Sequence, residues 1–171
     1  MIKLISKTTN KLSKSEMRGI CHLKNEEWKY GINSQLNWFY KNVKKGDLHN
    51  CFYMKQKLIG YTLLRKRTLK ISKKKIAYLL FDSLILKKKL RKKKLSTVMM
   101  MFNNSVIIKC KKLSFLICGN KLLNFYKKFS WKKLSNNKFS IADHSLRANG
   151  MLFDYSNKYD KINKFNFYFN K

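Results

Sequence analysis

The sequence predicts a mixed α/β fold, with a central, mostly antiparallel sheet, one parallel strand–loop–helix–strand crossover, and helices on both faces. Residues 76–86, "IAYLLFDSLIL", are almost entirely apolar, as expected of a central strand that is covered on both sides. A second apolar run, "LSFLIC" at 113–118, follows a segment with helical spacing, so the two runs should be parallel neighbours. Residues 48–54 and 58–71 precede them and are typical of an antiparallel hairpin.

The elements before the central strand follow from local signals. "IKLI" at the start predicts a short strand, and "SKSE" at Ser13–Glu16 fits a capping box that opens a helix. A second helix is expected over Ser34–Val43, which places its apolar residues on one face. The hairpin should turn at residues 55–57.

After the central strand, a basic loop at 86–96 leads into a helix and the second apolar strand. Asn120 should open a further helix, and weaker strand signals occur at 131–141 and 151–155. Residues 1–155 therefore read as a single domain. Residues 156–171 form either a low-complexity tail or an extra edge strand, because aromatic residues alternate there: Phe165, Phe167 and Phe169.

Composition limits the class of protein. The 171 residues are 44% hydrophobic, too apolar for a disordered polycation and enough for one domain with a core. The formal net charge of +32 favours anionic partners. The chain is also rich in Lys, Asn, Ile and Phe and has no Pro, which is the bias expected from an AT-rich genome. Such a bias would produce the same positive charge.

The four cysteines lie at positions 21, 51, 110 and 118, with no CxxC pair and no zinc-ligand spacing, so reduced thiols and no bound metal are expected.

The first residues lack the apolar region of a signal peptide, and no run is long enough to span a bilayer. We therefore expect a cytoplasmic protein.

The stretch "LKKKLRKKKLS", Leu86–Ser96, is the most informative motif. It connects the end of a strand to the start of a helix, where the first backbone amides lack partners inside the helix and phosphate binds readily. A solvated lysine face is the alternative, since charge runs usually lie in water.

Together with its flanks, "LILKKKLRKKKLSTVMM" resembles the cofactor signature of the GNAT N-acetyltransferase superfamily. In that signature a basic residue precedes two glycines; here Arg91 is the basic residue, and Lys94 and Ser96 occupy the glycine positions. "NFYKKFSW" is similar to the second family signature, with Ser130 in place of its glycine. The resemblance covers about residues 47–134.

The resemblance implies the acyl-CoA N-acyltransferase fold, acetyl-CoA as co-substrate, no metal, and acetyl transfer to a primary amine. The residues that it assigns to cofactor binding are Leu84 and Leu86 through their backbone, Arg91, Lys92, Lys93, Lys94, Leu95 and Ser96 around the pyrophosphate, and Asn120.

Two residues are candidates for proton transfer. Asp82, four residues before the strand ends, would accept the proton of the amine, directly or through water, and Tyr126 would protonate the leaving thiolate. Each has a structural alternative: a paired buried carboxylate for Asp82, and a core tyrosine for Tyr126.

The acceptor is expected to be small and neutral or anionic, such as an amino sugar, because only eight residues are acidic and a polycationic acceptor would need an acidic groove. The segments near Glu26, Glu27, Trp28 and Trp38 would form its pocket.

The alternatives to an acetyltransferase function are a non-enzymatic nucleic-acid or ribosome-binding protein and a degenerate, inactive acetyltransferase. Nucleic acid is otherwise expected to bind through non-specific charge only, and the protein to be a monomer or homodimer.

Overall fold

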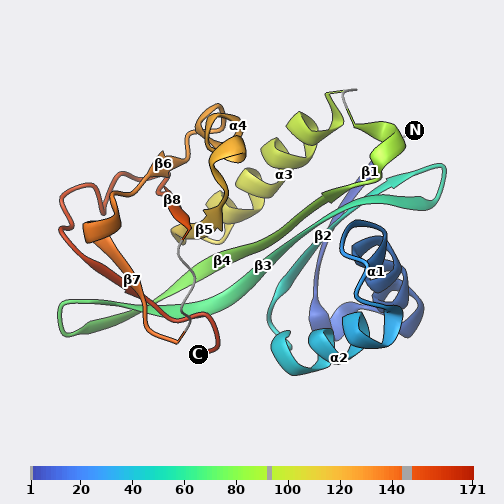
Figure 1. The fold of residues 1–171 in the computed structure, drawn as a ribbon, viewed down its shortest axis with the longest axis horizontal. Coiled ribbons are helices and arrows are strands. Elements are labelled where there is room, and N and C mark those ends of the chain that lie inside the picture. Colours follow the sequence, from blue (N-terminus) through green and yellow to red (C-terminus); the bar gives the residue numbers. More distant parts are fainter. Residues whose placement is uncertain (1, 92–93, 144–147) are drawn as a thin grey trace. The chain divides into compact units, whose positions relative to one another are not determined.

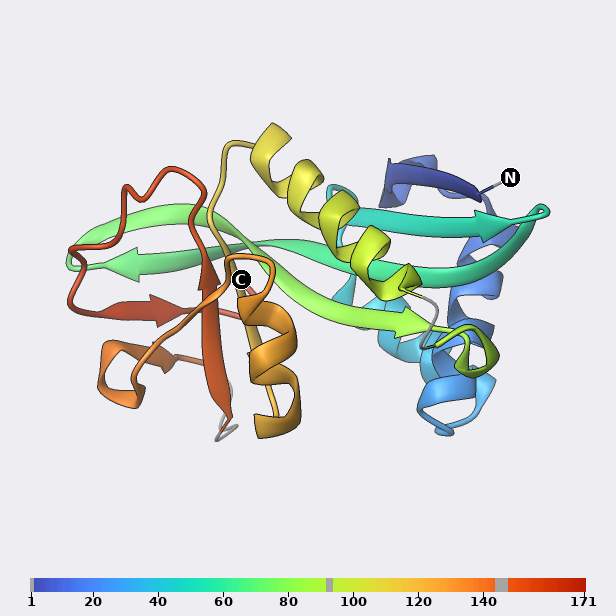
Figure 2. The same ribbon diagram turned by 90° about the horizontal axis from the view of Figure 1, so that it is seen from above.

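A computed structural model describes residues 2–91, 94–143 and 148–171. They fall into two compact units, which are described separately. The first unit comprises the described residues of Met1–Arg65 and Asp82–Asn103, and the second those of Lys66–Phe81 and Asn104–Lys171. Two long neighbouring strands and one helix run through both units: β3 (Lys57–Ile71), β4 (Lys74–Leu86) and α3 (Leu95–Lys109) (Figures 1 and 2).

Besides its parts of these three elements, the first unit contains β1 (Ile2–Thr8), a 3-10 turn (Thr9–Lys11), α1 (Lys14–Glu27), α2 (Ile32–Asn42), β2 (Leu48–Met54) and a second 3-10 turn (Lys88–Leu90). β1 pairs antiparallel with β2, and β2 pairs antiparallel with β3. The sheet order in this unit is β1-β2-β3-β4.

Local sequence explains where these elements begin and turn. The predicted capping box forms, with the Glu16 amide donating to Ser13 Oγ at 3.1 Å and the Ser13 amide to Glu16 Oε2 at 2.9 Å. The hairpin turns at Lys55 and Gln56, whose φ angles of 48° and 62° suit the tight turns that follow the twist of a hairpin. The second helix is α2, which starts at Ile32, two residues before the predicted start, after Gly31 at φ 85°.

The core of the first unit has two layers of side chains, one on each face of the sheet. Cys51 of β2 packs in a cluster with Ile20 and Leu23 of α1, whereas its neighbour Phe52 packs in a cluster with Met99 of α3. Because successive strand residues point to opposite faces, helices cover both sides, as predicted. Gly60 allows this packing: a Cβ atom there would lie 2.6 Å from the sulfur of Met99.

The second unit adds β5 (Ser114–Cys118), a 3-10 turn (Asn120–Leu122), α4 (Leu123–Lys127), β6 (Lys132–Lys133), a 3-10 turn (Asn136–Lys138), β7 (Phe139–Ile141), β8 (Asn149–Phe153) and β9 (Phe165–Phe167). β4 and β5 are parallel, with Leu79 opposite Ser114, which confirms the predicted crossover through α3. β8 is antiparallel to both β5 and β6.

The C-terminal segment takes part in the core of the second unit. β9 pairs antiparallel with β3 and parallel with β7, so the sheet has a second parallel pair that the sequence did not predict. Phe165 and Phe167 are buried, and the Phe167 ring stacks on Phe115 with 3.8 Å between centroids. Arg67 Nε donates to the Phe169 carbonyl oxygen at 2.8 Å.

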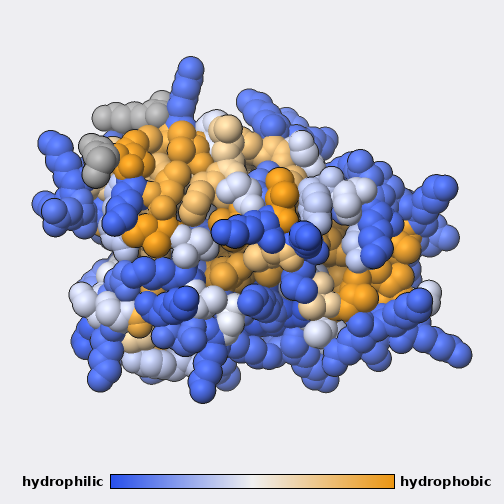
Figure 3. Space-filling model, turned by 180° about the vertical axis from the view of Figure 1, so that it is seen from behind, coloured by the Kyte–Doolittle hydropathy of each residue, from blue (hydrophilic) through white to orange (hydrophobic). Residues whose placement is uncertain are grey.

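Figure 3 shows hydrophilic side chains projecting around hydrophobic surface on one face. Within the described ranges, no helix has the length and apolar character needed to cross a membrane. Among the same residues, no three histidine, cysteine or acidic side chains gather into a group that could hold a metal ion.

Candidate active site

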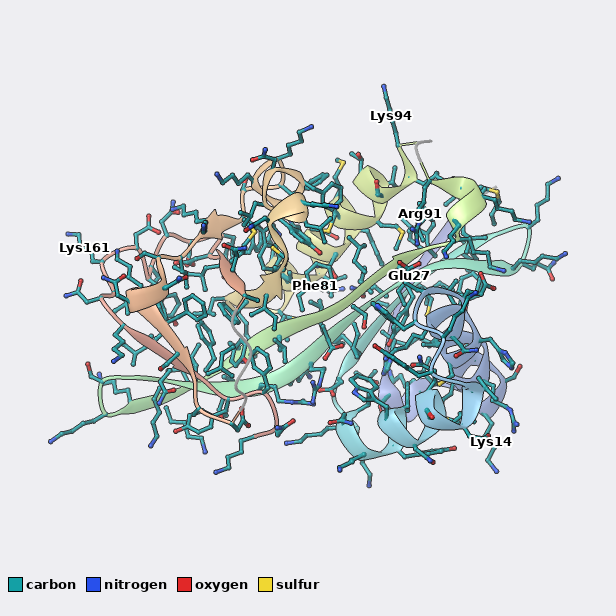
Figure 4. All side chains as sticks on the ribbon, viewed as in Figure 1. Lys14, Glu27, Phe81, Arg91, Lys94 and Lys161 are labelled. Atoms are coloured by element: carbon teal, nitrogen blue, oxygen red, sulfur yellow. The ribbon has the colours of Figure 1, made fainter. Side chains whose placement is uncertain are left out.

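The basic loop folds back on the end of β4 instead of extending into solvent. The Lys87 amide donates to the Ile59 carbonyl oxygen at 2.9 Å, and Arg91 Nε donates to the Leu86 carbonyl oxygen at 3.1 Å. The Arg91 guanidinium also forms an ion pair with Glu27 at the end of α1, and the two side chains point toward each other in Figure 4. The loop is therefore tied to both the strand and the first helix.

Leucines hold the loop in place, and the described lysines lie outside. Leu86 is buried, and Leu90 and Leu95 are partly buried, in the cluster with Phe52 and Met99. Leu84 belongs to the same cluster. Lys88, Lys89 and Lys94 are exposed, and Figure 4 shows Lys94 projecting away from the ribbon. This division explains why leucines recur within the lysine run.

The predicted anion-binding amides of Leu95 and Ser96 lie at the N-terminus of α3. Lys94 immediately precedes the helix, and its carbonyl oxygen accepts from the amides of Thr97 at 3.0 Å and Val98 at 3.4 Å. The amides of Leu95 and Ser96 come before these first intrahelical donors, where phosphate binds in other proteins. Lys92 and Lys93, two further predicted cofactor contacts, lie outside the described residues.

Lys94 and Ser130, which align with the glycines of the resembled signatures, have a backbone conformation that glycine adopts without strain. Lys94 has φ 56° and Ser130 has φ 64°, the left-handed region that costs a side chain about 1–2 kcal/mol. Ser130 lies in the turn that follows α4. There the Ser130 amide donates to the Lys127 carbonyl oxygen and the Trp131 amide to that of Tyr126, as in a helix C-cap with a left-handed residue.

We expect Lys94→Gly and Ser130→Gly each to raise the free energy of unfolding by up to about 1 kcal/mol, because glycine adopts positive φ without strain. Denaturant unfolding of the variants measures the change. Lys89→Gly is the matched control in the same loop: Lys89 is not among the positive-φ residues, so glycine there should destabilise. Equal losses in Lys94→Gly and Lys89→Gly would contradict the prediction.

A pocket of about 540 Å³ lies beside the loop in the first unit. Its lining comes from the end of α1, the end of β4 and the loop: Leu23, Glu26, Glu27, Lys29, Ile85, Leu86, Lys87, Lys88 and Lys89. The four lysines exceed the two glutamates, and one lining pair, Lys87 and Glu26, is 3.5 Å apart. A net positive lining favours a phosphorylated or otherwise anionic ligand.

Glu26 and Glu27, which were predicted to lie near an acceptor pocket, line the pocket beside the loop. Both also form ion pairs with the loop, Glu26 with Lys87 and Glu27 with Arg91. Their importance had a signal in the sequence: they are adjacent acids in a chain that has only eight.

Asp82 lies in the first unit and is paired with a buried cation. Arg65 Nη1 donates to Asp82 Oδ2 at 2.9 Å, and Ser83 Oγ donates to Asp82 Oδ1 at 3.1 Å. The side chains are 6% exposed for Arg65 and 19% for Asp82. Lys24 is buried nearby with its ammonium 3.4 Å from the Trp38 ring centroid, and burial lowers the pKa of Lys24. Asp82 is thus the carboxylate that compensates a buried cationic cluster.

Tyr126 lies on α4 in the second unit, within a group of aromatic rings. Its neighbours are Phe81, Phe125 and Trp131, at 5.3–6.1 Å between centroids. Burial raises the pKa of Tyr126, so the phenol stays protonated at neutral pH. Asn120, also in this unit, accepts a 2.8 Å hydrogen bond from Asn149 Nδ2 on its Oδ1.

No family model and no curated protein sequence matches the chain. Solved structures do. Escherichia coli ElaA has 15% sequence identity and a TM-score of 0.64, over 90% of this chain and 100% of its own. An acyl-CoA N-acyltransferase from Pseudomonas aeruginosa has 11% identity and a TM-score of 0.68, over 90% and 100%. The GNAT family N-acetyltransferase YhbS from Escherichia coli, solved in complex with CoA, has 9% identity and a TM-score of 0.70, over 99% and 91%.

Proposed function

We propose that this chain, which has the acyl-CoA N-acyltransferase fold, transfers an acetyl group from acetyl-CoA to a primary amine. The observation that carries the proposal is the backbone of the two signature turns. Lys94 and Ser130 have positive φ at the positions where the resembled signatures place glycine, which supports the assignment of both motifs.

The amides at the start of α3 would hold the pyrophosphate of acetyl-CoA. Leu95 and Ser96 supply N–H groups at a helix N-terminus, and the positive end of the helix dipole adds to their attraction. Arg91 contributes in a second way, because its hydrogen bond to the Leu86 carbonyl oxygen and its ion pair with Glu27 keep the loop folded. Asn120 remains a proposed cofactor contact.

The reaction forms a C–N bond and breaks the C–S bond of the thioester. The amine must give up a proton, which Asp82 would accept directly or through water, and the departing thiolate must gain one, which Tyr126 would donate. Burial raises the pKa of Tyr126, so its phenol is protonated when the thiolate forms but is a weaker acid than an exposed tyrosine. Asp82 Oδ2 already accepts a hydrogen bond from Arg65, so we propose that the proton reaches Asp82 through a water molecule.

The acceptor proposed is a small neutral or anionic amine such as an amino sugar. The excess of lysine over glutamate in the pocket beside the loop repels a polycation. It suits an acceptor that carries hydroxyl, carboxylate or phosphate groups.

Acetyl-CoA should raise the melting temperature of the protein. At 100 times the Kd the stabilisation is about 2.7 kcal/mol, which corresponds to a shift of roughly 5–10 °C for a chain of this size. Acetyl-pantetheine, which lacks the pyrophosphate, should shift it much less. Differential scanning fluorimetry and calorimetry measure both; no shift with millimolar acetyl-CoA on folded protein would disprove cofactor binding.

Tyr126→Phe should preserve the fold and acetyl-CoA binding but lower kcat by about 100-fold, since only the hydroxyl is removed. Turnover is measured as release of free CoA with a panel of amines. Tyr155→Phe, a change at an exposed tyrosine of the same unit, is the control and should keep full activity. Parental turnover in Tyr126→Phe would exclude the proposed role.

A further inference from the structure

Three exposed aromatic side chains of the first unit are not among the residues that line the pocket beside the loop. Tyr30, in the turn between α1 and α2, is 73% exposed, and Tyr40 on α2 is 68% exposed. Trp28, at the end of α1, is also exposed. Aromatic rings usually gain stability from burial, so three rings left exposed within residues 28–40 make this segment a candidate contact surface.

The packing of α2 explains why Tyr40 faces outward. Gln35 and Phe39 are buried, and Asn33, Asn37 and Tyr40 are exposed, at the i, i+4, i+7 spacing of one helix face. The outward face therefore presents two side-chain amides and a phenol ring.

The turn that carries Tyr30 is held by hydrogen bonds. Asn25 Oδ1 accepts from the Gly31 amide at 2.9 Å, and Gln35 Nε2 donates to the Trp28 carbonyl oxygen at 2.9 Å. The Tyr30 amide also donates to the Trp28 carbonyl oxygen, at 2.8 Å. An ordered turn reduces the conformational entropy that the aromatic side chains would lose on binding a partner.

The charged residues within segment 28–46 all have one sign. The segment "WKYGINSQLNWFYKNVKKG", residues 28–46, contains four lysines and no acidic residue. All four lysines are exposed: Lys29, Lys41, Lys44 and Lys45. Lys29 also lines the pocket beside the basic loop, so this aromatic–lysine surface reaches the edge of the candidate active site.

We propose that the aromatic–lysine surface of α2 and the preceding turn binds single-stranded nucleic acid. Tyrosine and tryptophan rings stack on unpaired bases, lysines contact the phosphates, and asparagine amides form hydrogen bonds with base edges. A membrane surface fits less well, because the outward face of α2 presents Asn33 and Asn37 where an interfacial helix would place apolar residues. The proposal is independent of acetyl transfer.

The test compares variants of this surface with matched variants elsewhere. Tyr30→Ser/Tyr40→Ser is paired with Tyr155→Ser, an exposed tyrosine of the second unit. Lys41→Gln/Lys44→Gln/Lys45→Gln is paired with the same change at three exposed lysines of the second unit, Lys73, Lys74 and Lys75. Fluorescence anisotropy with a 12-nucleotide single-stranded RNA, its duplex and vesicles containing anionic lipid measures binding at two salt concentrations.

The surface tyrosine pair should weaken single-strand binding roughly tenfold or more, whereas Tyr155→Ser should change it less than about twofold. The surface lysine triple should weaken it more than the control triple, although both remove the same charge. Unchanged melting temperatures show that the variants are folded. Equal losses in the matched variants, tighter binding to duplex, or tyrosine-dependent binding to vesicles alone would overturn the proposal, as they would indicate non-specific charge, duplex recognition or a membrane.

Discussion

Ser96→Trp is expected to abolish acetyl-CoA binding, lowering affinity by at least about 100-fold, while the chain stays folded. Ser96 is the second residue of α3, and its amide precedes the first intrahelical donors. A large ring at this position would occupy the space in which the pyrophosphate has to approach the backbone, and the loss of charge-assisted hydrogen bonds to it accounts for the size of the effect. Isothermal titration calorimetry with acetyl-CoA measures the affinity.

Met101→Trp is the control, since Met101 is exposed on the same helix and the same bulky residue is introduced outside the N-terminal turn. It should bind acetyl-CoA like the parent. Lys87→Ala/Lys88→Ala should cost only a small, salt-screened attraction. If Ser96→Trp leaves affinity intact while each lost lysine reduces it, the loop binds anions by charge and does not cradle a cofactor.

Asp82→Asn is expected to lower the free energy of unfolding by about 3 kcal/mol, because it leaves the buried Arg65 guanidinium without its counter-charge. Asp160→Asn is the matched control: Asp160 pairs with Lys132 at 2.8 Å, but both side chains are about half exposed, so the loss should be under about 1 kcal/mol. Urea unfolding of the two variants gives the comparison.

The same substitution tests the proposed base when Arg65 is changed with it. Arg65→Gln/Asp82→Asn removes both charges and should recover part of the stability. If Asp82 accepts the proton of the amine, turnover stays reduced about 100-fold in this double variant despite the recovery. Activity that returns together with stability would assign Asp82 a structural role only.

The sequence alone predicted most of the fold, because its signals were local. The capping box at Ser13–Glu16, the hairpin turn at Lys55 and Gln56, and the apolar run of β4 each depend on neighbouring residues and on spacing. The order of elements then determined the parallel β4–β5 crossover. The short strands near the C-terminus were less predictable, because β6, β7 and β9 have only two or three residues each, too few to show a period.

The tertiary structure decided the environment of the candidate site. Glu27 and Arg91 lie 64 residues apart in sequence, and Arg65 and Asp82 lie 17 apart, so no local pattern indicates that they form ion pairs. The same holds for Phe167, which is buried because β9 pairs with β3 and β7. Charge pairing and burial depend on which distant segments meet, whereas turns and periodicity depend on adjacent residues. The sequence therefore determined the elements of this protein, and the folded chain determined which of its charges are compensated.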